Sequence, residues 1–284
     1  MHFNKVTILG VGLIGASFAQ AMRAYNLCSY IVGSGRSLEN LQRAKNKKII
    51  DFLEVDPLRA CKDSDLIVLA TPVGVFIDIT KRIRGSLKKG VIVTDVGSVK
   101  GKLVRDLETL MPEGVFFVGT HPIAGSDRSG IDSASQDIFK GAKCIVTPTE
   151  NTKKDILDKV IKIWETFGSY VKIINPEEHD RIYAAVSHLP HLIAYEIVNS
   201  VADINSSYLK FSGQGFLDTT RIASSSPELW RDICIFNRDN LLESIEKFQK
   251  NLDRVIQYLR VKDSKSLEID FQKARALREG IGKN

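Results

Sequence analysis

The sequence is short of the residues that mark secreted, zinc-binding or membrane-spanning proteins. Its 284 residues include 4 cysteines, which lie far apart and form no Cys-x-x-Cys pair, so neither a disulfide framework nor a zinc ribbon is expected. The start, MHFNKVTILGVG, lacks the apolar segment and cleavage site of a signal peptide. No stretch reaches 18 apolar residues, so we expect no contact with a membrane. A cytoplasmic location is therefore predicted.

A concentrated basic surface is also missing. Lys and Arg number 40 and Asp and Glu number 34, which gives a formal charge of +6, but the basic residues are scattered along the chain. Nucleic-acid-binding proteins concentrate such residues in a patch or stripe. We therefore expect small anionic ligands and no nucleic acid.

Residues 1–175 alternate short apolar runs with amphipathic segments. The runs expected to form strands are 6–10, 30–33, 66–70, 91–95, 115–119, 144–147 and 171–174. Helices are expected over 15–25, 38–45, 75–83 and 152–167. This alternation predicts a mostly parallel sheet with helices on both faces. The fold class is α/β, with a Rossmann-type dinucleotide-binding domain in 1–175 and an all-α substrate and dimerisation domain in 176–284.

The all-α part contains one feature that favours a homodimer. Residues 177–202 predict a helix, and Ser226-Pro227-Glu228 predicts the start of another. The apolar residues that follow recur every three or four positions: Leu241, Ile245, Phe248, Leu252, Ile256 and Leu259. An unbroken helix over 227–260 would be about 50 Å long, which is awkward to bury within one subunit. The alternative is a break near Asn237 that gives two ordinary helices.

A glycine motif at the end of the first strand predicts a dinucleotide cofactor. The motif is Gly10-Val11-Gly12-Leu13-Ile14-Gly15. Gly10 permits the tight turn, Gly12 lets the backbone approach a pyrophosphate, and Gly15 lets helix and strand pack closely. The helix that begins here offers N–H groups to the phosphates. A glycine-rich structural turn is the alternative, but the strand and helix on either side favour the cofactor.

The end of the second strand favours NADP over NAD. The sequence there reads Gly33-Ser34-Gly35-Arg36-Ser37, without the acidic residue that bonds the ribose hydroxyls in NAD enzymes. Arg36 and Ser37 are suited to a 2′-phosphate, because the planar guanidinium matches phosphate oxygens. In the alternative, Arg36 stacks on the adenine and NAD still binds. Thr71, Pro72 and Val73 follow the next strand and are also expected at the cofactor.

Among the residues that follow the strands, His121 is the best candidate for catalysis. It follows the run 115–119, and Pro122 after it stiffens the chain. Imidazole can take a hydroxyl proton near neutral pH, as oxidation of an alcohol requires. A histidine that bonds backbone at a loop corner remains the alternative at this point.

Four motifs resemble the prephenate and arogenate dehydrogenases, in that family's order and spacing. They are DVGSVKGKL (95–103), GTHPIAGSDRSG (119–130), SHLPHLIA (187–194) and TRIASSSPELWRD (220–232). The resemblance covers essentially the whole chain. It implies hydride transfer from a cyclohexadienol to NAD(P)⁺ with loss of carbon dioxide, which yields 4-hydroxyphenylpyruvate or tyrosine. Aromatisation makes such a step effectively irreversible, so the protein mainly has to align its substrate and place charge.

The resemblance also assigns roles to individual residues. The histidine that bonds the ring hydroxyl is His121, and the serine near the nicotinamide is Ser98. Ser187 and His191 match positions that line the substrate pocket. Arg221 matches the anchor of a substrate carboxylate, a task that suits a fixed, bidentate cation.

Two further residues of the histidine motif, Ser126 and Asp127, are expected at the substrate. Asp127 could attract the ammonium group of arogenate, or could cap or gate its loop, so the choice between prephenate and arogenate stays open. No regulatory domain is seen after the helical part, which predicts weak or purely competitive inhibition by tyrosine.

Other histidines and Trp230 are expected to have no catalytic role, and two rival functions are considered. His2 and His179 look incidental, and Trp230 looks like a core or interface residue. The pair His188 and His191 could share a helical face, but a third metal ligand is not evident, so no metal is expected. The rival functions are a β-hydroxyacid dehydrogenase, whose lysine motif is missing here, and a non-catalytic NADP sensor.

Overall fold

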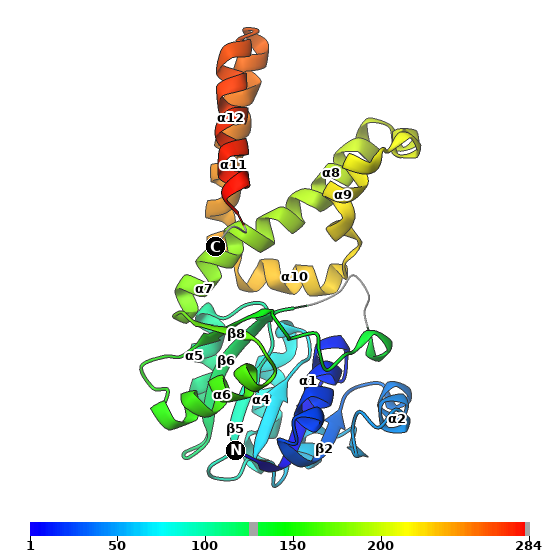
Figure 1. Ribbon diagram of the computed structural model, residues 1–284, viewed down its shortest axis with the longest axis vertical. Helices are drawn as coiled ribbons and strands as arrows, with labels where there is room; N and C mark the ends of the chain where they lie inside the picture. Colours follow the sequence, from blue (N-terminus) through cyan, green and yellow to red (C-terminus); the bar gives the residue numbers. More distant parts are fainter. Residues whose placement is uncertain (125–129, 282–284) are drawn as a thin grey trace. The chain divides into compact units, whose positions relative to one another are not determined.

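The computed structural model describes residues 1–124 and 130–281. The chain divides into two compact units, residues 1–238 and 239–284. The first contains the sheet and most of the helices, and the second is helical (Figure 1). Within the described ranges, no helix is both long enough and apolar enough to cross a membrane.

The described strands of the first unit form one sheet in the order β3-β2-β1-β4-β5-β6-β7-β8. All neighbouring strands are parallel except β6 and β7, which confirms the mostly parallel sheet. The strands are Phe3–Leu9 (β1), Cys28–Ser34 (β2), Phe52–Leu53 (β3), Leu66–Leu69 (β4), Ile92–Asp95 (β5), Phe116–Ile123 (β6), Lys143–Thr147 (β7) and Tyr170–Ile173 (β8). The edge strand β3 was not expected, because two residues are too few to show a hydrophobic pattern.

The strand order locates the ligand-binding edge of the sheet. The chain runs from β1 to β2 on one side and returns to β4 on the other side of β1. Ligands in such sheets bind beyond the carboxyl ends of the strands, where the order reverses. Leu9 pairs with Leu69 at the ends of β1 and β4. The loops that follow these residues therefore leave the sheet side by side.

Helices cover both faces of the sheet and enclose two apolar clusters. The helices are Leu13–Ala24 (α1), Leu38–Asn46 (α2), Pro57–Cys61 (α3), Phe76–Ile83 (α4), Gly101–Leu110 (α5) and Lys154–Thr166 (α6). One cluster is centred on Phe18 of α1 and Trp164 of α6, whose rings are 5.5 Å apart. The other joins α4 and α5 through Phe76 and Leu103. The short helix α3 and the helix α5, which begins at a glycine, were not expected.

The helical region begins at Pro176, directly after the sheet. Its helices are Pro176–Tyr183 (α7), Leu189–Asn205 (α8), Gln214–Thr220 (α9) and Pro227–Phe236 (α10). The single helix expected over 177–202 is interrupted by a π-helical turn, Ala184–His188. Pro190 lacks the N–H that an unbroken α-helix would use there, which accounts for the local change of hydrogen bonding. Ser226 caps α10 as expected, since its hydroxyl oxygen accepts from the Leu229 N–H.

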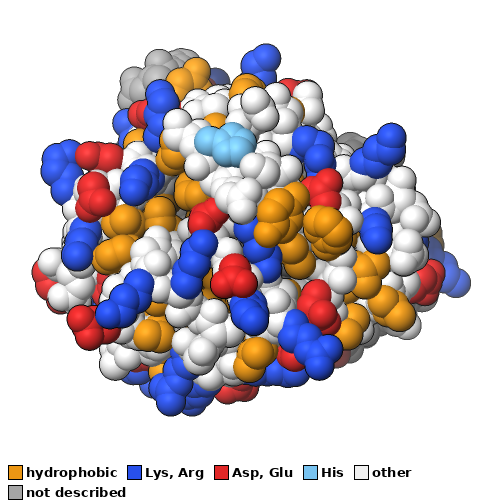
Figure 2. Space-filling view, turned by 90° about the horizontal axis from the view of Figure 1, so that it is seen from below, with side chains coloured by type: hydrophobic (Ala, Val, Ile, Leu, Met, Phe, Trp, Pro, Cys, Tyr) orange, Lys and Arg blue, Asp and Glu red, His pale blue; other side chains and the backbone are white. Residues whose placement is uncertain are grey.

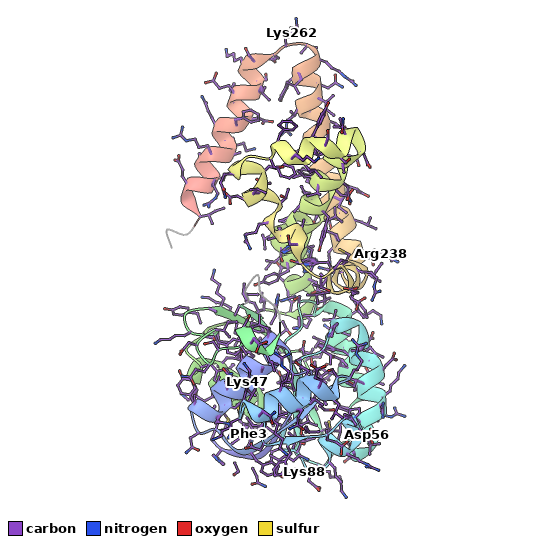
Figure 3. All side chains as sticks on the ribbon, turned by 90° about the vertical axis from the view of Figure 1, so that its right-hand side faces the viewer. Phe3, Lys47, Asp56, Lys88, Arg238 and Lys262 are labelled. Atoms are coloured by element: carbon purple, nitrogen blue, oxygen red, sulfur yellow. The ribbon has the colours of Figure 1, made fainter. Side chains whose placement is uncertain are left out.

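The long helix considered for 227–260 is broken at Asn237. α10 ends at Phe236, and the next helix is Arg238–Arg260 (α11). The second unit consists of most of α11 and of Ser264–Gly280 (α12), with Lys262 labelled in the turn between them (Figure 3). Within it, Arg254 pairs with Asp270 at 2.8 Å. Large apolar side chains of both helices are exposed, among them Leu252, Leu259, Ile269 and Phe271.

Charged side chains of both signs share the surface. On the face seen in Figure 2, basic and acidic side chains are interspersed, with apolar side chains between them. This face shows the scattered charge expected from the sequence. Salt bridges such as Lys88 to Asp65 and Arg82 to Asp56 join oppositely charged neighbours on this unit.

Candidate active site

The glycine-rich loop joins β1 to α1, and its three glycines have different surroundings. Gly10 has a φ of +101°, and a Cβ there would lie 2.5 Å from the carbonyl oxygen of Ala70. A Cβ on Gly15 would lie 2.1 Å from the carbonyl oxygen of Gly10. At Gly12, by contrast, a Cβ would meet no atom within 4 Å. Gly10 and Gly15 are thus required by the protein's own packing, while Gly12 faces space that a ligand can use.

A cavity of about 590 Å³ lies beside this loop. Most residues predicted to bind the cofactor line it: Gly10, Gly12, Ser34, Gly35, Arg36, Ser37, Thr71 and Pro72. The remaining ones lie outside its lining, in α1 and in the turn after β4: Leu13, Ile14, Gly15 and Val73. The hydroxyl oxygen of Thr71 is buried and has no partner among the described residues. A buried unpaired hydroxyl and an open glycine both fit a bound dinucleotide.

The end of β2 presents cationic and hydroxyl groups to this cavity. Arg36 is exposed at its rim, and Ser37 caps α2 by accepting from the Asn40 N–H at 3.1 Å. The hydroxyl proton of Ser37 remains available to an anion. Arg82 of α4 lines the same cavity and pairs with Asp56 at 2.9 Å. Arg82 was not predicted from the sequence, because the spacing of residues in a helix does not show which cavity each of them faces.

His121 lies near the end of β6 and pairs with Ile145 of β7. The strand continues to Ile123, so the histidine belongs to the strand and does not follow it as expected. Its side chain is nearly buried, and burial, followed by the neighbouring His179 and Lys100, holds the pKa of His121 well below its usual range. The ring is therefore neutral near pH 7, the form that can accept a proton.

His179, on α7, is the hydrogen-bond partner of His121. Its Nε2 lies 2.8 Å from Nδ1 of His121. The side chain is fully buried, and burial lowers its pKa to about 2. The expectation that His179 is incidental is therefore wrong. A histidine early in a predicted helix resembles any core position, and only the adjacent Asp180 gave a weak signal of a polar network.

Asp180 orients His179 from the other side. Its Oδ1 lies 2.8 Å from Nδ1 of His179 and accepts the backbone N–H of Lys100 at 2.7 Å. The carboxylate is buried, and burial raises its pKa to about 6 in spite of these hydrogen bonds. Asp180 is thus largely ionised at neutral pH and links α7 to the loop that follows β5.

A buried ion pair shapes the loop that carries Ser98. Lys100 Nζ donates to Asp95 Oδ2 at 2.5 Å, and to the carbonyl oxygens of Gly97 and Val99 at 2.7 and 3.1 Å. With three acceptors, the ammonium group has a partner for each of its protons. Ser98 is half-buried in this loop, beside the β6 strand of His121. Within the described residues, no hydrogen bond joins the Ser98 side chain to His121.

The predicted residues of the helical region lie around the π-helical turn. His191 Nδ1 is 2.9 Å from the Ser187 carbonyl oxygen, and its ring stacks on Trp230 with the centroids 3.6 Å apart. Burial lowers the pKa of His191, and the positive charge of Arg221 adds to this effect. The structure therefore brings Ser187, His191 and Arg221 together, and gives Trp230 a stacking role beside the expected core position.

His188 connects these residues to the histidines at the sheet edge. It is buried, and Asn237 places its Nδ2 3.0 Å from His188 Nδ1 while donating to the Asp180 carbonyl oxygen at 2.8 Å. The His188 ring also faces Trp230, with the centroids 6.0 Å apart. His188 and His191 thus bond to different protein groups, and in the described ranges no cluster of three or more His, Cys, Asp or Glu could hold a metal.

Two predicted substrate residues, Ser126 and Asp127, lie outside the described residues. Of their motif, the structure describes residues 119–124 and 130. The interpretations of Asp127 as an ammonium partner, a cap or a gate remain predictions from the sequence.

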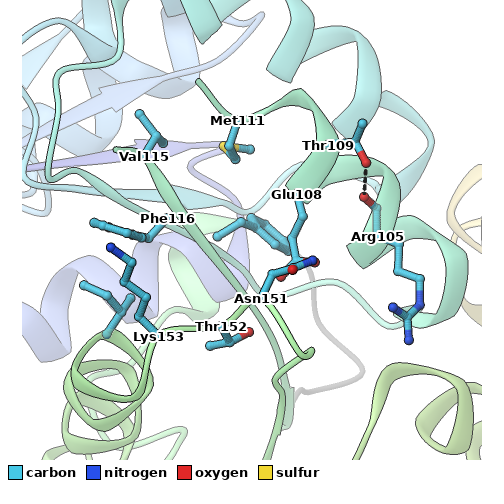
Figure 4. A pocket seen from close by; sticks show the side chains of 11 residues that line it. Arg105, Glu108, Thr109, Met111, Val115, Phe116, Asn151, Thr152 and Lys153 are labelled. Atoms are coloured by element: carbon cyan, nitrogen blue, oxygen red, sulfur yellow. Dashed lines mark hydrogen bonds between the residues drawn. The ribbon is translucent and has the colours of Figure 1, made fainter. Parts of the chain in front are cut away.

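A second cavity, of about 400 Å³, lies between α5 and α6 (Figure 4). Arg105, Glu108 and Lys153 line it, together with the ring of Phe116 at the start of β6. Arg105 is already paired with Glu150 and Glu177. This cavity contains none of the predicted site residues, so its volume alone does not mark it as an active site.

Two family models match the chain. One, described as "Prephenate dehydrogenase, nucleotide-binding domain", matches residues 18–173, and the other, "Prephenate dehydrogenase, dimerization domain", matches residues 175–273. Together they cover more than half of the chain.

Characterised proteins agree along nearly the whole length. A prephenate dehydrogenase of Bacillus subtilis is 32% identical over 99% of this chain and 77% of its own. A cyclohexadienyl dehydrogenase of Zymomonas mobilis is 30% identical over 97% of this chain and 95% of its own. The solved structure of A. aeolicus prephenate dehydrogenase with hydroxyphenyl propionate and NAD⁺ is 35% identical, with a TM-score of 0.93 over 99% of both chains.

Proposed function

Because this chain belongs to the prephenate dehydrogenase family, we propose that it oxidises prephenate or arogenate with loss of carbon dioxide. The product is 4-hydroxyphenylpyruvate or tyrosine. The observation that carries the proposal is a buried, neutral histidine, His121, at the carboxyl edge of a sheet that also holds a dinucleotide cavity. A neutral imidazole is the group that oxidation of a hydroxyl requires there.

The chain's own residues divide the work between proton transfer and positioning. His121 accepts the proton of the ring hydroxyl at Nε2, the nitrogen that His179 does not engage. Ser98 orients the same hydroxyl from the loop after β5. Arg221 binds a substrate carboxylate, and Ser187 and His191 line the pocket beside it. Their grouping around the π-helical turn supports this assignment, and π-helical turns are frequent at functional sites.

The loops at the ends of β1, β2 and β4 hold the dinucleotide. A nicotinamide dinucleotide bound there would supply the acceptor for the hydride that leaves the hydroxyl carbon of the substrate. The backbone at Gly10 and Gly12 would accommodate its pyrophosphate at the start of α1, and the unpaired Thr71 hydroxyl would offer a further hydrogen bond. Gly15 supports the shape of this loop by packing against the Gly10 carbonyl oxygen, while Leu13, Ile14 and Val73 lie outside the cavity lining.

NADP is the proposed physiological cofactor. Ser34, Gly35, Arg36 and Ser37 line the cavity, and Arg82, which pairs with Asp56, adds a second cation from α4. Fixed cations and hydroxyls favour a 2′-phosphate over a free ribose hydroxyl.

Arg36→Ala should lower kcat/KM for NADP about 10- to 100-fold, as expected for a charge-assisted hydrogen bond, with little change for NAD. Lys45→Ala, an exposed cation of α2 outside the cavity lining, is the matched control. Equal losses for both cofactors would contradict the assignment.

The activity itself is tested by measuring reduced nicotinamide by absorbance. Prephenate and arogenate should each be tried with NADP⁺ and NAD⁺, and carbon dioxide should be released in equal amount to the reduced cofactor. The combination of cyclohexadienol and dinucleotide that gives turnover identifies the substrate and the cofactor together. No turnover with either cyclohexadienol would overturn the proposed function, whereas a β-hydroxyacid as the sole substrate would favour the rival dehydrogenase.

We also propose a homodimer formed through the helical region. The exposed apolar residues of α11 and α12, such as Leu252 and Phe271, are suited to burial against a second copy, and one family model carries the description of a dimerization domain.

The proposed domain boundary between 175 and 176 is supported by the end of β8 at Ile173 and the start of α7 at Pro176. The cytoplasmic location stays a prediction.

A further inference from the structure

His121 has two ring nitrogens, and only one of them is engaged by the described protein. Its Nδ1 is 2.8 Å from His179 Nε2. Within the described residues no protein group bonds Nε2. A neutral imidazole carries one proton, and the tautomer decides which nitrogen can act as a base. The reaction therefore depends on which nitrogen of His121 holds the proton.

The surroundings of His179 determine that tautomer. Its Nδ1 lies 2.8 Å from a carboxylate oxygen of Asp180, which can only accept a hydrogen bond when ionised. The proton of neutral His179 must therefore lie on Nδ1. Its Nε2 is left as an acceptor, and the facing Nδ1 of His121 must be the donor. Nε2 of His121 then has a free lone pair.

We propose that His179, oriented by Asp180, is a positioning residue that holds His121 as the tautomer protonated at Nδ1, with Nε2 ready to accept the substrate hydroxyl proton. This inference rests on the proposed function and deepens it. In the step, the O–H bond of the substrate breaks and its proton passes to His121 Nε2. The electron pair of that bond forms the C=O bond, as hydride leaves the same carbon for the oxidised dinucleotide of the proposed function. The resulting imidazolium keeps its hydrogen bond to His179, and the proton later returns to solvent.

The rest of the network fixes this arrangement. The same Asp180 oxygen accepts the Lys100 N–H at 2.7 Å, and Asn237 donates to the Asp180 carbonyl oxygen at 2.8 Å. The Tyr183 ring contacts both histidines, with its centroid 4.5 Å from that of His179 and 4.9 Å from that of His121. Backbone and ring contacts from three elements thus hold the pair in one geometry, as a preorganised site requires.

The tautomer can be read directly by NMR, because the chain has 5 histidines. In protein labelled with ¹⁵N-histidine, protonated and unprotonated ring nitrogens have well-separated chemical shifts. His121, His179 and His191 should carry their proton on Nδ1, and His188, whose Nδ1 faces the Asn237 amide, on Nε2. A wild-type His121 protonated at Nε2 would overturn the proposal, whatever substrate the enzyme uses.

Two substitutions at His179 separate positioning from packing. His179→Phe keeps the ring shape but removes the acceptor, so the Nδ1 tautomer of His121 should be lost and kcat should fall about a hundredfold, as for loss of a general base. The KM of the substrate should change less than about twofold. His179→Gln can offer an amide oxygen in place of Nε2, and should retain the tautomer and most of kcat.

The outcomes are distinct. A His179→Phe protein with wild-type kcat overturns the inference, and so does a His179→Gln protein that folds but loses kcat as severely as His179→Phe. If wild-type protein turns over neither cyclohexadienol while its His121 carries the proton on Nδ1, the proposed function fails and the positioning role stands. If His179→Phe does not fold, the ¹⁵N spectra of the wild type and of His179→Gln still show which ring nitrogen of His121 carries the proton, and so still test the proposal.

Discussion

Arg221 is a side chain whose chemistry, rather than its charge alone, should matter. A guanidinium can bind a carboxylate with two parallel hydrogen bonds, which an ammonium group cannot do. Arg221→Lys should therefore raise the KM of the substrate about tenfold while kcat changes less, as measured by initial rates at saturating cofactor. Arg231→Lys, an exposed position on α10, serves as control. Unchanged KM in Arg221→Lys would remove the carboxylate anchor from the account.

The sequence predicted individual residues well where the backbone dictates them and poorly where packing does. Gly10 and Gly15 were identified because a turn and a close approach leave no room for a Cβ. His121 and Arg221 were identified through motifs. His179 is not predictable in this way, because its role depends on α7 lying beside the end of β6, a contact between positions 58 residues apart. No local pattern encodes such a contact.

At the scale of elements, substitutions in the glycine loop should affect folding and cofactor binding separately. Gly12→Ala adds a methyl group in open space, so the thermal midpoint should hardly change, while affinity for the reduced cofactor should fall at least about tenfold because the pyrophosphate must approach there. Gly15→Ala pushes a Cβ against the Gly10 carbonyl, and should destabilise by about 2 kcal/mol or more. Fluorescence titration and thermal melts measure both. Wild-type cofactor affinity in Gly12→Ala would place the pyrophosphate elsewhere.

Elements with a strong hydrophobic pattern were predictable, and those set by hydrogen bonding were not. All seven expected strands are present, and β3 was not predicted because it has only two residues. The π-helical turn at Ala184–His188 was invisible in apolar spacing, which does not distinguish one helical hydrogen-bond pattern from another over a single turn. The break at Asn237 could be offered only as an alternative, since the apolar residues that recur every three or four positions all follow it, from Leu241 to Leu259.

For the whole molecule, the buried histidines predict a loss of stability in acid. Burial lowers the pKa of His179 to about 2, that of His188 to about 4 and that of His121 well below its usual range. Below about pH 6.5 these histidines are protonated in the unfolded chain but stay neutral in the folded state. The free energy of unfolding should therefore fall by about 1.4 kcal/mol for each pH unit of acidification and for each such histidine. Asp180 opposes one of them, because its folded pKa is raised to about 6 and the folded state gains its proton first.

Urea unfolding at pH 7, 6 and 5 checks this behaviour. The expected result is a marked fall in stability between pH 6.5 and 5, with a shallower fall in His179→Gln, which has one fewer buried histidine. A stability that is flat from pH 7 to 5 would show that the buried rings are not held neutral in the folded protein.

The most direct test of the account is the turnover of His121→Asn, measured beside its binding of cofactor. Asparagine keeps a polar side chain at the end of β6 but cannot take a proton. We expect kcat with the active cyclohexadienol to fall by about a hundredfold or more, while the affinity for the dinucleotide stays within about twofold. A variant that turns over at nearly the wild-type rate would contradict the role of His121.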